Sequence, residues 1–576
     1  MFRRPGKWIV LGILIIAQMR VECHAAAKPS IILITADSVR ADRMGFLGGK
    51  GALTPNLDAM ARQSVVFAQA YAQSPGTVSS HATILSGTYP QTHRASEFSV
   101  PLSAALPYLP DLLHSAGYKT AAFVGSILLD PKDGPFQKYD RGFGVYDANF
   151  HPPQRGESHD QSVDRRASDV IARATKWLAE NKQRPVFLWV QIHDPEQASS
   201  ATYDRAIAAA DAAIGKLLDS LRKQSFYEDA AIVVTSAHGE SLGAHGEETH
   251  GLFLHDETIH VPLLLKLPKA QMAGRRVKNR VRLLDIAPTL LEAAGLSVPS
   301  QMQGQSLLRL AQSASQSEQP AYARADLPEH GFQCSAIESW RSGKWLYIRA
   351  PKPELYDLSA DPGASHNLAA TSKATLDTLA SLLQAFDSRL ANEHNSSASS
   401  LTSSEMQKLA SLGYVGLQKS DAGVKAAAEG PDITDSIFLA NKTLAAMRDL
   451  DDGKPEKAIP ALKSVIDVQP NIYMAQFGLA SALFQQQKFA DAIPYLHKAI
   501  ELQPGSAWAH YLMGVSLVKT GDFKTSEVHL QVASQRLPSF TPVHSALAEV
   551  YEHLGRTQEA ARERASISGG DHKKND

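Results

Sequence analysis

The stretch Ile31-Ile32-Leu33-Ile34-Thr35-Ala36-Asp37 decides how the first part of this chain folds. Its run of apolar, β-branched residues is typical of a strand that is buried on both faces. Similar short runs recur, with longer amphipathic stretches between them, at residues 120–124, 186–190, 231–234 and 261–265. This alternation predicts an α/β domain over residues 28–393, with a largely parallel sheet covered by helices on both faces.

Polar residues follow three of these runs. Asp37 ends the first, Asp194 follows the run at 186–190, and His238 follows the run at 231–234. Ligands of open α/β sheets bind beyond the carboxyl ends of the strands. We therefore expect these three side chains to meet at one edge of the sheet and to form a site there.

The composition of the whole chain excludes several classes of protein. Its 576 residues predict at least two domains, at roughly 100–200 residues per domain. The 58 Lys and Arg nearly balance the 59 Asp and Glu, so charge gives no reason to expect nucleic acid as a partner. Two cysteines exclude both a disulfide framework and a four-cysteine metal site.

The N-terminus has the order of a secretory signal peptide, which we place at residues 1–27. Three basic residues precede an apolar run over residues 8–19, and alanines follow at 25–27. The run is shorter than the roughly 20 residues that a transmembrane helix needs. Cleavage would remove Cys23 and leave Cys334 alone, which suits export to a bacterial periplasm. The alternative is an uncleaved segment that holds the protein at the inner membrane.

The C-terminal part repeats with a period of 34 residues, beyond a Ser-rich linker that we place at residues 394–434. Its columns are Gly453, Gly521 and Gly555, then Ala458, Ala492 and Ala560, then Pro470, Pro504 and Pro538. A helix–turn–helix unit of this length that closes on proline is the tetratricopeptide pattern. We predict three to four repeats in an all-α solenoid over residues 435–570. Such solenoids bind a protein or peptide on their concave face, the alternative being a packing module with no outside partner.

Seven ordered blocks in the first domain resemble a known family. They are residues 34–42, 54–58, 77–90, 193–195, 237–240, 256–262 and 355–358. Together they are similar to the sulfatase family of the alkaline-phosphatase superfamily, over about residues 29–370. The combination with C-terminal tetratricopeptide repeats resembles a bacterial exported subgroup.

The resemblance implies roles for individual residues. In this superfamily a hydroxyl attacks sulfur or phosphorus while a divalent cation lowers the hydroxyl pKa and neutralises the oxyanion. Thr77 stands in the nucleophile position, and Asp37 and His238 are implied metal ligands. His81 takes the place of the arginine that follows the nucleophile in relatives, and is therefore a second catalytic candidate. The implied cation is Ca²⁺, Zn²⁺ or Mn²⁺, which rank such ligands differently.

A looser analogy, with two-metal phosphodiesterases, adds two further metal ligands. These are Asp194 and His250, which would help to build a second metal position.

Several positions depart from the family pattern. Formylglycine sulfatases oxidise a Cys or Ser in a Cys/Ser-x-Pro-x-Arg context, whereas this chain has Thr77, Ser79 and His81 there. A formylglycine is therefore not expected, although a threonine can accept the transferred group directly. Ala237 replaces a metal-binding aspartate, and Glu196 stands where many relatives have a histidine.

Two functions from different classes follow. The first is an exported metal-dependent hydrolase or transferase that acts through Thr77 on a sulfate or phosphate ester, either a small molecule or linked to a glycan or lipid. The second is a catalytically degenerate member that keeps the fold as a binding or scaffold module. The retained polar cluster favours the enzyme, and Ala237 favours the binding module. Metal analysis of the purified protein discriminates between them.

Overall fold

The computed structural model describes most of the chain. The described residues are 28–49, 53–95, 102–131, 138–148, 150, 165–182, 185–193, 200–313, 318–393 and 430–569. The signal peptide predicted at 1–27, the Ser-rich stretch at 395–404 and the candidate ligand Asp194 lie outside them.

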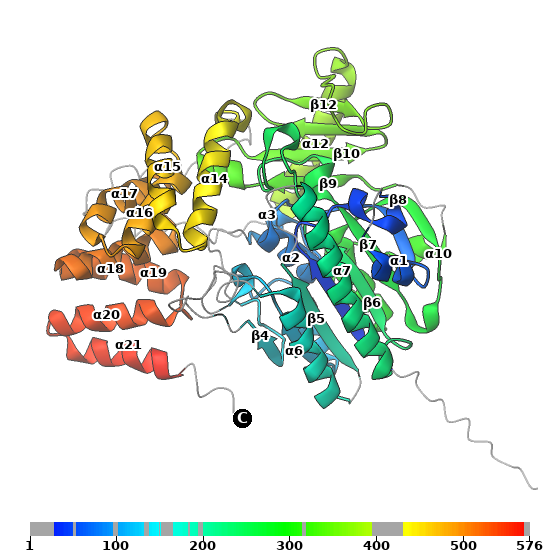
Figure 1. Ribbon diagram of the computed structural model, residues 1–576, viewed down its shortest axis with the longest axis horizontal. Helices are drawn as coiled ribbons and strands as arrows, with labels where there is room; N and C mark the ends of the chain where they lie inside the picture. The colour runs from blue at the N-terminus through cyan, green and yellow to red at the C-terminus, as the bar shows by residue number, and fades with distance from the viewer. Residues whose placement is uncertain are drawn as a thin grey trace, which may run out of the picture.

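The centre of the first domain is an eight-stranded sheet with the order β4-β3-β5-β1-β6-β7-β2-β8. Figure 1 labels its strands β4, β5, β6, β7 and β8. The strands are β1 Ile31–Ala36, β2 Val65–Tyr71, β3 Lys119–Phe123, β4 Val145–Asp147, β5 Val186–Ile192, β6 Ala231–Ser236, β7 His260–Lys266 and β8 Arg276–Arg282. Strand β7 runs antiparallel to β6 and β2, and the other described pairs are parallel. The predicted α/β fold class is confirmed, and each of the five predicted runs forms a strand.

Helices cover both faces of this sheet, and β1 explains why. Ile31 and Leu33 belong to one hydrophobic cluster, whereas Ile32 and Ile34 belong to another on the opposite face. The first cluster includes side chains of α2 (Thr77–Ser86), α4 (Leu109–Ser115) and α9 (Ile286–Ala293). The second includes side chains of α1 (Pro55–Ala61), α6 (Ala167–Glu180) and α7 (Ser200–Lys223). The strand is apolar throughout because both of its faces are buried.

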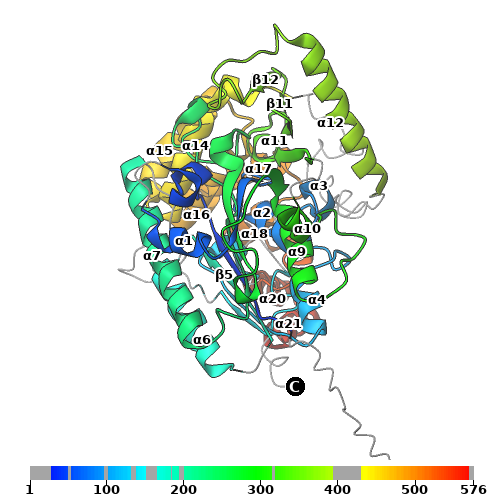
Figure 2. The same cartoon turned by 90° about the vertical axis from the view of Figure 1, so that its right-hand side faces the viewer.

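A smaller antiparallel sheet follows the main one, in the order β12-β11-β10-β9. Its strands are β9 Ala321–Ala325, β10 Ile337–Ser342, β11 Trp345–Arg349 and β12 Glu354–Asp357. Figure 2 shows the long helix α12 (Lys373–Glu393) beside it, and Phe386 of α12 packs on Trp340 of β10. The short helices of this domain are α3 Pro90–His93, α8 Asp256–Ile259, α10 Leu308–Gln312 and α11 Leu327–Phe332. The sequence did not predict this second sheet.

The C-terminal region is a stack of four helical pairs, coloured from yellow to red in Figure 1. The pairs are α14 Ile437–Asp451 with α15 Pro455–Val468, α16 Tyr473–Gln485 with α17 Phe489–Leu502, α18 Ala507–Thr520 with α19 Phe523–Arg536, and α20 Thr541–His553 with α21 Thr557–Gly569. The prediction of an all-α solenoid is confirmed. Among the described helices, none is both long and apolar enough to cross a bilayer.

The turns inside the pairs explain the glycine column of the repeat. Gly453, Gly521 and Gly555 have φ angles of 67°, 92° and 73°, which favour glycine because it lacks a Cβ. The equivalent residue of the second pair is Gln487, which takes the same conformation with a φ of 60°. The fold therefore imposes a left-handed residue at this turn even where the sequence has no glycine.

Gly514 of α18 marks a close helix contact, and we expect it to tolerate no side chain. A Cβ on Gly514 would lie 2.5 Å from Cγ of Leu530 on α19. Gly514→Val should destabilise the repeats by about 1–3 kcal/mol through overpacking, measured by urea unfolding followed by circular dichroism. Combining it with Leu530→Ala should cost less than the sum of the two single changes. Additive losses would mean that the two residues do not compete for the same space.

Candidate active site

Three adjacent strands bring the candidate residues to one edge of the sheet. Ala36 at the end of β1 lies opposite Ile192 of β5 and Ser236 of β6. The next residues in the three strands are therefore neighbours: Asp37, His193 and Ala237. Two backbone hydrogen bonds keep these residues side by side. The Asp37 N–H donates to the Ile192 carbonyl, and the Ala237 N–H donates to the Ala36 carbonyl.

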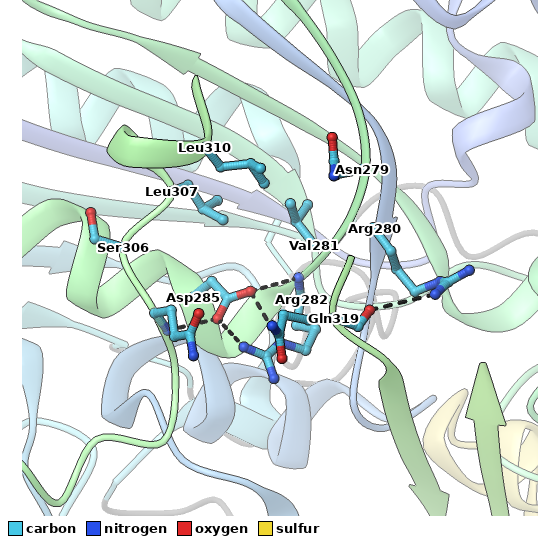
Figure 3. A pocket seen from close by; sticks show the side chains of 10 residues that line it. Asn279, Arg280, Val281, Arg282, Asp285, Ser306, Leu307, Leu310 and Gln319 are labelled. Atoms are coloured by element: carbon cyan, nitrogen blue, oxygen red, sulfur yellow. Dashed lines mark hydrogen bonds and ion pairs between the residues drawn. The ribbon is translucent and has the colours of Figure 1, made fainter. Parts of the chain in front are cut away.

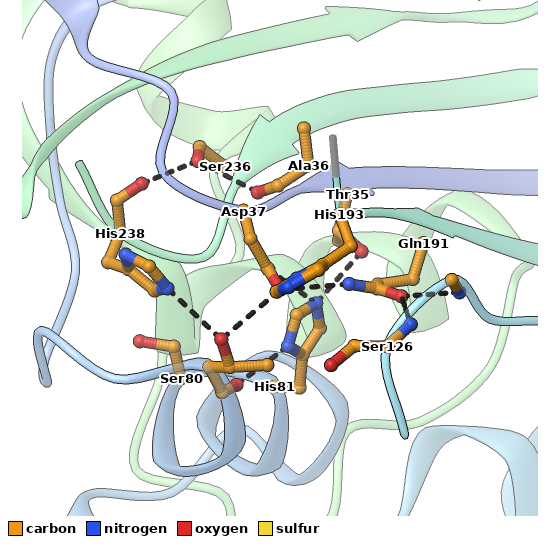
Figure 4. Close-up of polar contacts among 12 residues, drawn as sticks. Thr35, Ala36, Asp37, Ser80, His81, Ser126, Gln191, His193, Ser236 and His238 are labelled. Atoms are coloured by element: carbon orange, nitrogen blue, oxygen red, sulfur yellow. Dashed lines mark hydrogen bonds and ion pairs between the residues drawn. The ribbon is translucent and has the colours of Figure 1, made fainter. Parts of the chain in front are cut away.

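Thr77 faces this edge from the first residue of α2. Its hydroxyl oxygen lies 3.1 Å from Oδ2 of Asp37 and 3.1 Å from Nε2 of His238. Figure 4 labels these two partners. The N-cap, Gly76, makes no side-chain capping bond, and the first N–H groups of a helix have no partner within the helix. The positive end of α2 therefore points where a transferred anionic group would sit.

The two carboxylate oxygens of Asp37 differ in their hydrogen bonding. Oδ2 accepts from the Thr77 hydroxyl, from Nε2 of Gln191 at 2.9 Å and from Nδ1 of His193 at 3.1 Å. Oδ1 is buried without a hydrogen-bond partner among the described residues. A buried carboxylate oxygen in this state is costly unless something else satisfies it.

The charges of the site follow from burial and from the histidines. Burial opposes ionisation of Asp37, but the hydrogen bond from His193 and the neighbouring imidazoles outweigh it and hold the Asp37 pKa below its ordinary value. Burial lowers the pKa of His238 to about 3, helped by His250 and opposed by Asp37. At neutral pH the site therefore contains one carboxylate and a neutral His238.

The backbone fixes the tautomer of His238. Its Nδ1 lies 2.9 Å from the Gly239 carbonyl, which can only accept, so Nδ1 carries the proton. Nε2 then has a free lone pair towards the Thr77 hydroxyl. Two acceptors, Asp37 and His238, compete for the single hydroxyl proton of Thr77, so one of them receives no hydrogen bond from this hydroxyl.

His81 lies beneath Thr77 rather than beside the open site. It is fully buried, its Nδ1 donates to the Thr77 carbonyl at 2.7 Å, and its Nε2 lies 2.9 Å from the Thr35 hydroxyl. Burial lowers the pKa of this histidine, although Asp37 opposes the shift. In this arrangement both ring nitrogens are engaged within the protein, and His81 supports the first turn of α2.

His250 extends the cluster away from Thr77. Its ring centroid lies 4.2 Å from that of His238, and its Nδ1 lies 2.9 Å from Oε2 of the buried Glu240. The structure thus brings Asp37, Thr77, His238 and His250 into one continuous series of contacts.

The loop after β1 is anchored from α7. Ser38 has a φ of 57°, an uncommon conformation for a residue with a Cβ. The Tyr203 hydroxyl donates to the Ser38 carbonyl at 2.6 Å and accepts from the Arg40 N–H at 3.0 Å. These two bonds keep the turn that aims Asp37 at Thr77, so the strain at Ser38 lies next to the candidate site.

The described residues fit a divalent cation at Thr77. Asp37 supplies a carboxylate with an unsatisfied oxygen, Thr77 a hydroxyl and His238 an unprotonated nitrogen. The Thr77 oxygen lies 3.1 Å from Nε2 of His238 and 3.1 Å from Oδ2 of Asp37, which three donors already satisfy, so the oxygen of Asp37 left for a cation is Oδ1.

A tighter group of metal-type side chains lies elsewhere and is already neutralised. Among the described residues, Asp326, Glu329 and His330 are the group of three whose donor atoms lie within 4.8 Å of one another. Arg324 forms ion pairs with both Asp326 and Glu329. The guanidinium takes the place that a cation would need.

A cavity of about 350 Å³ lies at the far edge of the sheet (Figure 3). It is lined by Arg280, Arg282 and Asp285 among others, beside β8, which is four strands from β1. Arg282 pairs with Asp285 at 2.8 Å, and Arg280 donates to the Gly343 carbonyl at 2.6 Å. The charges around the cavity are largely paired within the protein, and it is separate from the Thr77 site.

Two partners of Asp37, His193 and Gln191, were not predicted from the sequence. His193 stands directly after β5, next to the candidate ligand Asp194. Gln191 is a fully buried polar residue inside the otherwise apolar β5. A polar residue in such a strand needs a buried partner, and that signal was available.

Glu247, close to His250, makes stability depend on pH. Burial raises the pKa of its carboxyl to about 8, against the opposing effect of N–H donation from Leu252 and Phe253. Because the folded pKa exceeds the unfolded one, this stabilisation is complete below pH 4.5 and is lost as pH rises through about 8.

Glu247→Gln should therefore remove this loss. The unfolding free energy of the variant should gain on the wild type across that interval, by at most about 1.4 kcal/mol per pH unit. Urea unfolding at several pH values measures the difference. Glu248→Gln changes an exposed neighbour and should leave the slope unchanged. Parallel curves for wild type and Glu247→Gln would contradict the assignment.

Comparison with protein families divides the chain in the same way as its fold. The Sulfatase family model matches residues 29–296, and a model for the C-terminal part of N-sulphoglucosamine sulphohydrolase matches residues 249–392. Two tetratricopeptide repeat models match residues 443–507 and 483–548.

Comparison with characterised proteins gives distant relatives. Arylsulfatase K of Mus musculus is 29% identical over 251 residues, which are 38% of this chain and 44% of that protein. The chain thus spans less than half the length of this relative. An ulvan-active sulfatase of Formosa agariphila is 25% identical, over 62% of this chain and 80% of its own length. A Delta 4,5-hexuronate-2-O-sulfatase of Bacteroides thetaiotaomicron is 24% identical over 60% and 86%.

Solved structures support the fold. A phosphonate monoester hydrolase of Agrobacterium radiobacter superimposes with a TM-score of 0.53 at 20% identity, over 63% of this chain and 96% of that one. The structure described as Ps i-CgsB gives a TM-score of 0.52 at 23% identity, over 62% and 92%.

Proposed function

This chain carries a sulfatase-family domain followed by tetratricopeptide repeats, and on that premise we propose that it hydrolyses a sulfate or phosphate ester through Thr77. The contact of the Thr77 hydroxyl with both Asp37 and His238 is the observation that carries the proposal. A hydroxyl between two acceptors, at the positive end of a helix, is placed to act as a nucleophile towards an anionic group.

In the proposed reaction, different residues of the chain carry out different steps. The N-terminus of α2 binds the oxygens of the transferred group. The Thr77 oxygen forms a bond to sulfur or phosphorus, and the bond from that atom to the substrate alcohol breaks. The Thr77 proton passes to water, because Nε2 of His238 is the nitrogen that would hold a cation while Nδ1 stays bonded to the Gly239 carbonyl. The departing alcohol oxygen takes a proton from water. A second water then attacks the sulfur or phosphorus atom, one of its protons returns to the Thr77 oxygen, and the inorganic anion is released.

Burial makes His238 a weak base, so the hydroxyl needs further activation. A divalent cation held by Asp37, His238 and the Thr77 oxygen would lower the pKa of the hydroxyl and neutralise the developing negative charge. Asp194 and His250 remain proposed ligands of a second position, the first of them outside the described residues.

The substrate class is proposed from the relatives. An ulvan-active sulfatase and a hexuronate-2-O-sulfatase are among them, so a sulfate ester on a glycan is the first class to test. Export through the signal at residues 1–27 would bring the enzyme to such substrates, and N-terminal sequencing of the mature protein tests it.

The test of the proposed function is a substrate panel with metal analysis. Purified protein is assayed with para-nitrophenyl sulfate, para-nitrophenyl phosphate and the corresponding phosphodiester, with Zn²⁺, Mn²⁺ or Ca²⁺ added. Turnover that depends on a cation is the expected result.

Ala237 specifically favours a second function. It leaves one family-type carboxylate, Asp37, at the described site, as expected of a degenerate binding module. Absence of turnover with every ester and cation, together with metal-free protein, would favour this module over the enzyme.

A further inference from the structure

The loop that carries His250 is closed by hydrogen bonds within its own backbone, and it contains glycines in left-handed conformations. Ser241 N–H donates to the Thr249 carbonyl at 2.7 Å, and Gly243 N–H donates to the Glu247 carbonyl at 2.8 Å. Gly243, Gly246 and Gly251 have φ angles of 90°, 86° and 106°. Three such glycines leave the unfolded loop many conformations, so contacts from outside must help to select one.

The first repeat supplies such contacts at the tip of the loop. The side-chain amide of Asn441 on α14 donates from Nδ2 to the Gly246 carbonyl at 2.7 Å and accepts at Oδ1 from the Glu248 N–H at 3.2 Å. This single side chain therefore binds the backbone on both sides of Glu247. Ile437 of the same helix lies 3.7 Å from the point that a Cβ on Gly246 would occupy.

The second repeat supports the other end of the loop through α11. Leu327 of α11 packs so closely on Gly251 that a Cβ there would lie 2.8 Å from it. One turn further along the same face of α11, a Cβ on Gly331 would lie 2.8 Å from Sδ of Met474 on α16. Helix α11 thus contacts both the loop and the second repeat.

We propose that the repeats position the His250 loop of the active site, and that Asn441 is a positioning residue for the reaction. The loop runs from His238, at the Thr77 hydroxyl, through Glu240 to His250. His250 is bonded to Glu240, and its ring is tilted by 31° against that of His238 at a centroid distance of 4.2 Å. A clamp on its tip therefore fixes the distance between the two histidines. This inference rests on the proposed function, because it assigns that function a dependence on the repeats.

The experiment combines hydrogen exchange with kinetics on the full-length protein. Asn441→Ala removes both bonds to the loop, and Asn441→Gln restores an amide of the same chemistry. Asn471→Ala, at an exposed asparagine between α15 and α16, is the matched control. The exchange readout is the peptide amides at Glu248 and at Leu252 and Phe253, which follow His250.

In Asn441→Ala, exchange at these amides should rise at least about 10-fold while the repeat helices stay protected. With an active ester substrate, kcat should fall about 10–100-fold and KM should change less than about 3-fold, because the substrate anion binds at α2 and not at the loop. Asn441→Gln should recover part of both effects, and Asn471→Ala should change neither.

An unchanged rate of hydrogen exchange at the loop amides in Asn441→Ala would overturn the proposal that Asn441 fixes the loop. Faster exchange with an unchanged kcat overturns the positioning role. A wild type without turnover would sink the proposed function separately, since exchange at the loop is measured without any substrate.

Discussion

Thr77→Ala should lower kcat by at least about 10³-fold, because it removes the only atom that the proposed mechanism attaches to sulfur or phosphorus. The alanine keeps the start of α2 and the bond from His81 to the carbonyl of residue 77, so the fold should survive. Thr77→Ser keeps the hydroxyl and should retain measurable turnover. The measurement is initial rates with the best ester of the panel.

The control for Thr77 lies at the other end of the same helix. Ser86 donates its hydroxyl to the Ala82 carbonyl, away from the site, so Ser86→Ala should leave kcat within about 3-fold of the wild type. Equal rates for wild type and Thr77→Ala would remove Thr77 from the mechanism, whatever the other variants do.

Ala237→Asp should raise the affinity for a divalent cation by at least about 10-fold. Residue 237 follows β6 at the level where Asp37 follows β1, and its side chain is fully buried. A second carboxylate there would supply the charged ligand that the site lacks. Calorimetric titration with Zn²⁺ and Mn²⁺ measures the change.

Without metal, Ala237→Asp should also have a lower free energy of unfolding than the wild type. Two buried carboxylates without a cation repel each other and lose their hydration, at a cost of roughly 3 kcal/mol, and saturating metal should restore most of it. Ala237→Asn has the same shape without the charge and is the matched control. If Ala237→Asp binds metal no better than the wild type, the loop no longer presents residue 237 to the site, and the binding-module function gains.

The sequence predicted the core of the site because strand ends are local features. Asp37 and His238 each follow a buried run, and parallel neighbours in register bring such ends together. Thr77 needed the family resemblance, since its helix comes from another part of the chain. Its contact with both residues then followed from the packing of α2 on the sheet.

The remainder depended on long-range contacts that no local pattern encodes. The antiparallel direction of β7 results from its pairing with the distant β2, whereas periodicity reports only burial. The second sheet is the exception, because its strands follow one another in the chain. The contact of His81 with the Thr35 hydroxyl joins residues 46 positions apart, so no local pattern around His81 encodes it. Asn441 carried no signal at all, because one asparagine in a helix acquires its role only from the loop it meets.

In the proposed mechanism, the start of α2 attracts the product as well as the substrate. The inorganic anion set free by hydrolysis carries at least as much negative charge as the ester group did, and the helix N-terminus attracts both. Chemistry that is fast at such a site leaves departure of the anion as the slow step. Inorganic sulfate or phosphate should therefore inhibit competitively. In a medium poor in both ions, kcat of the proposed enzyme would be limited by the rate at which the anion leaves the start of α2.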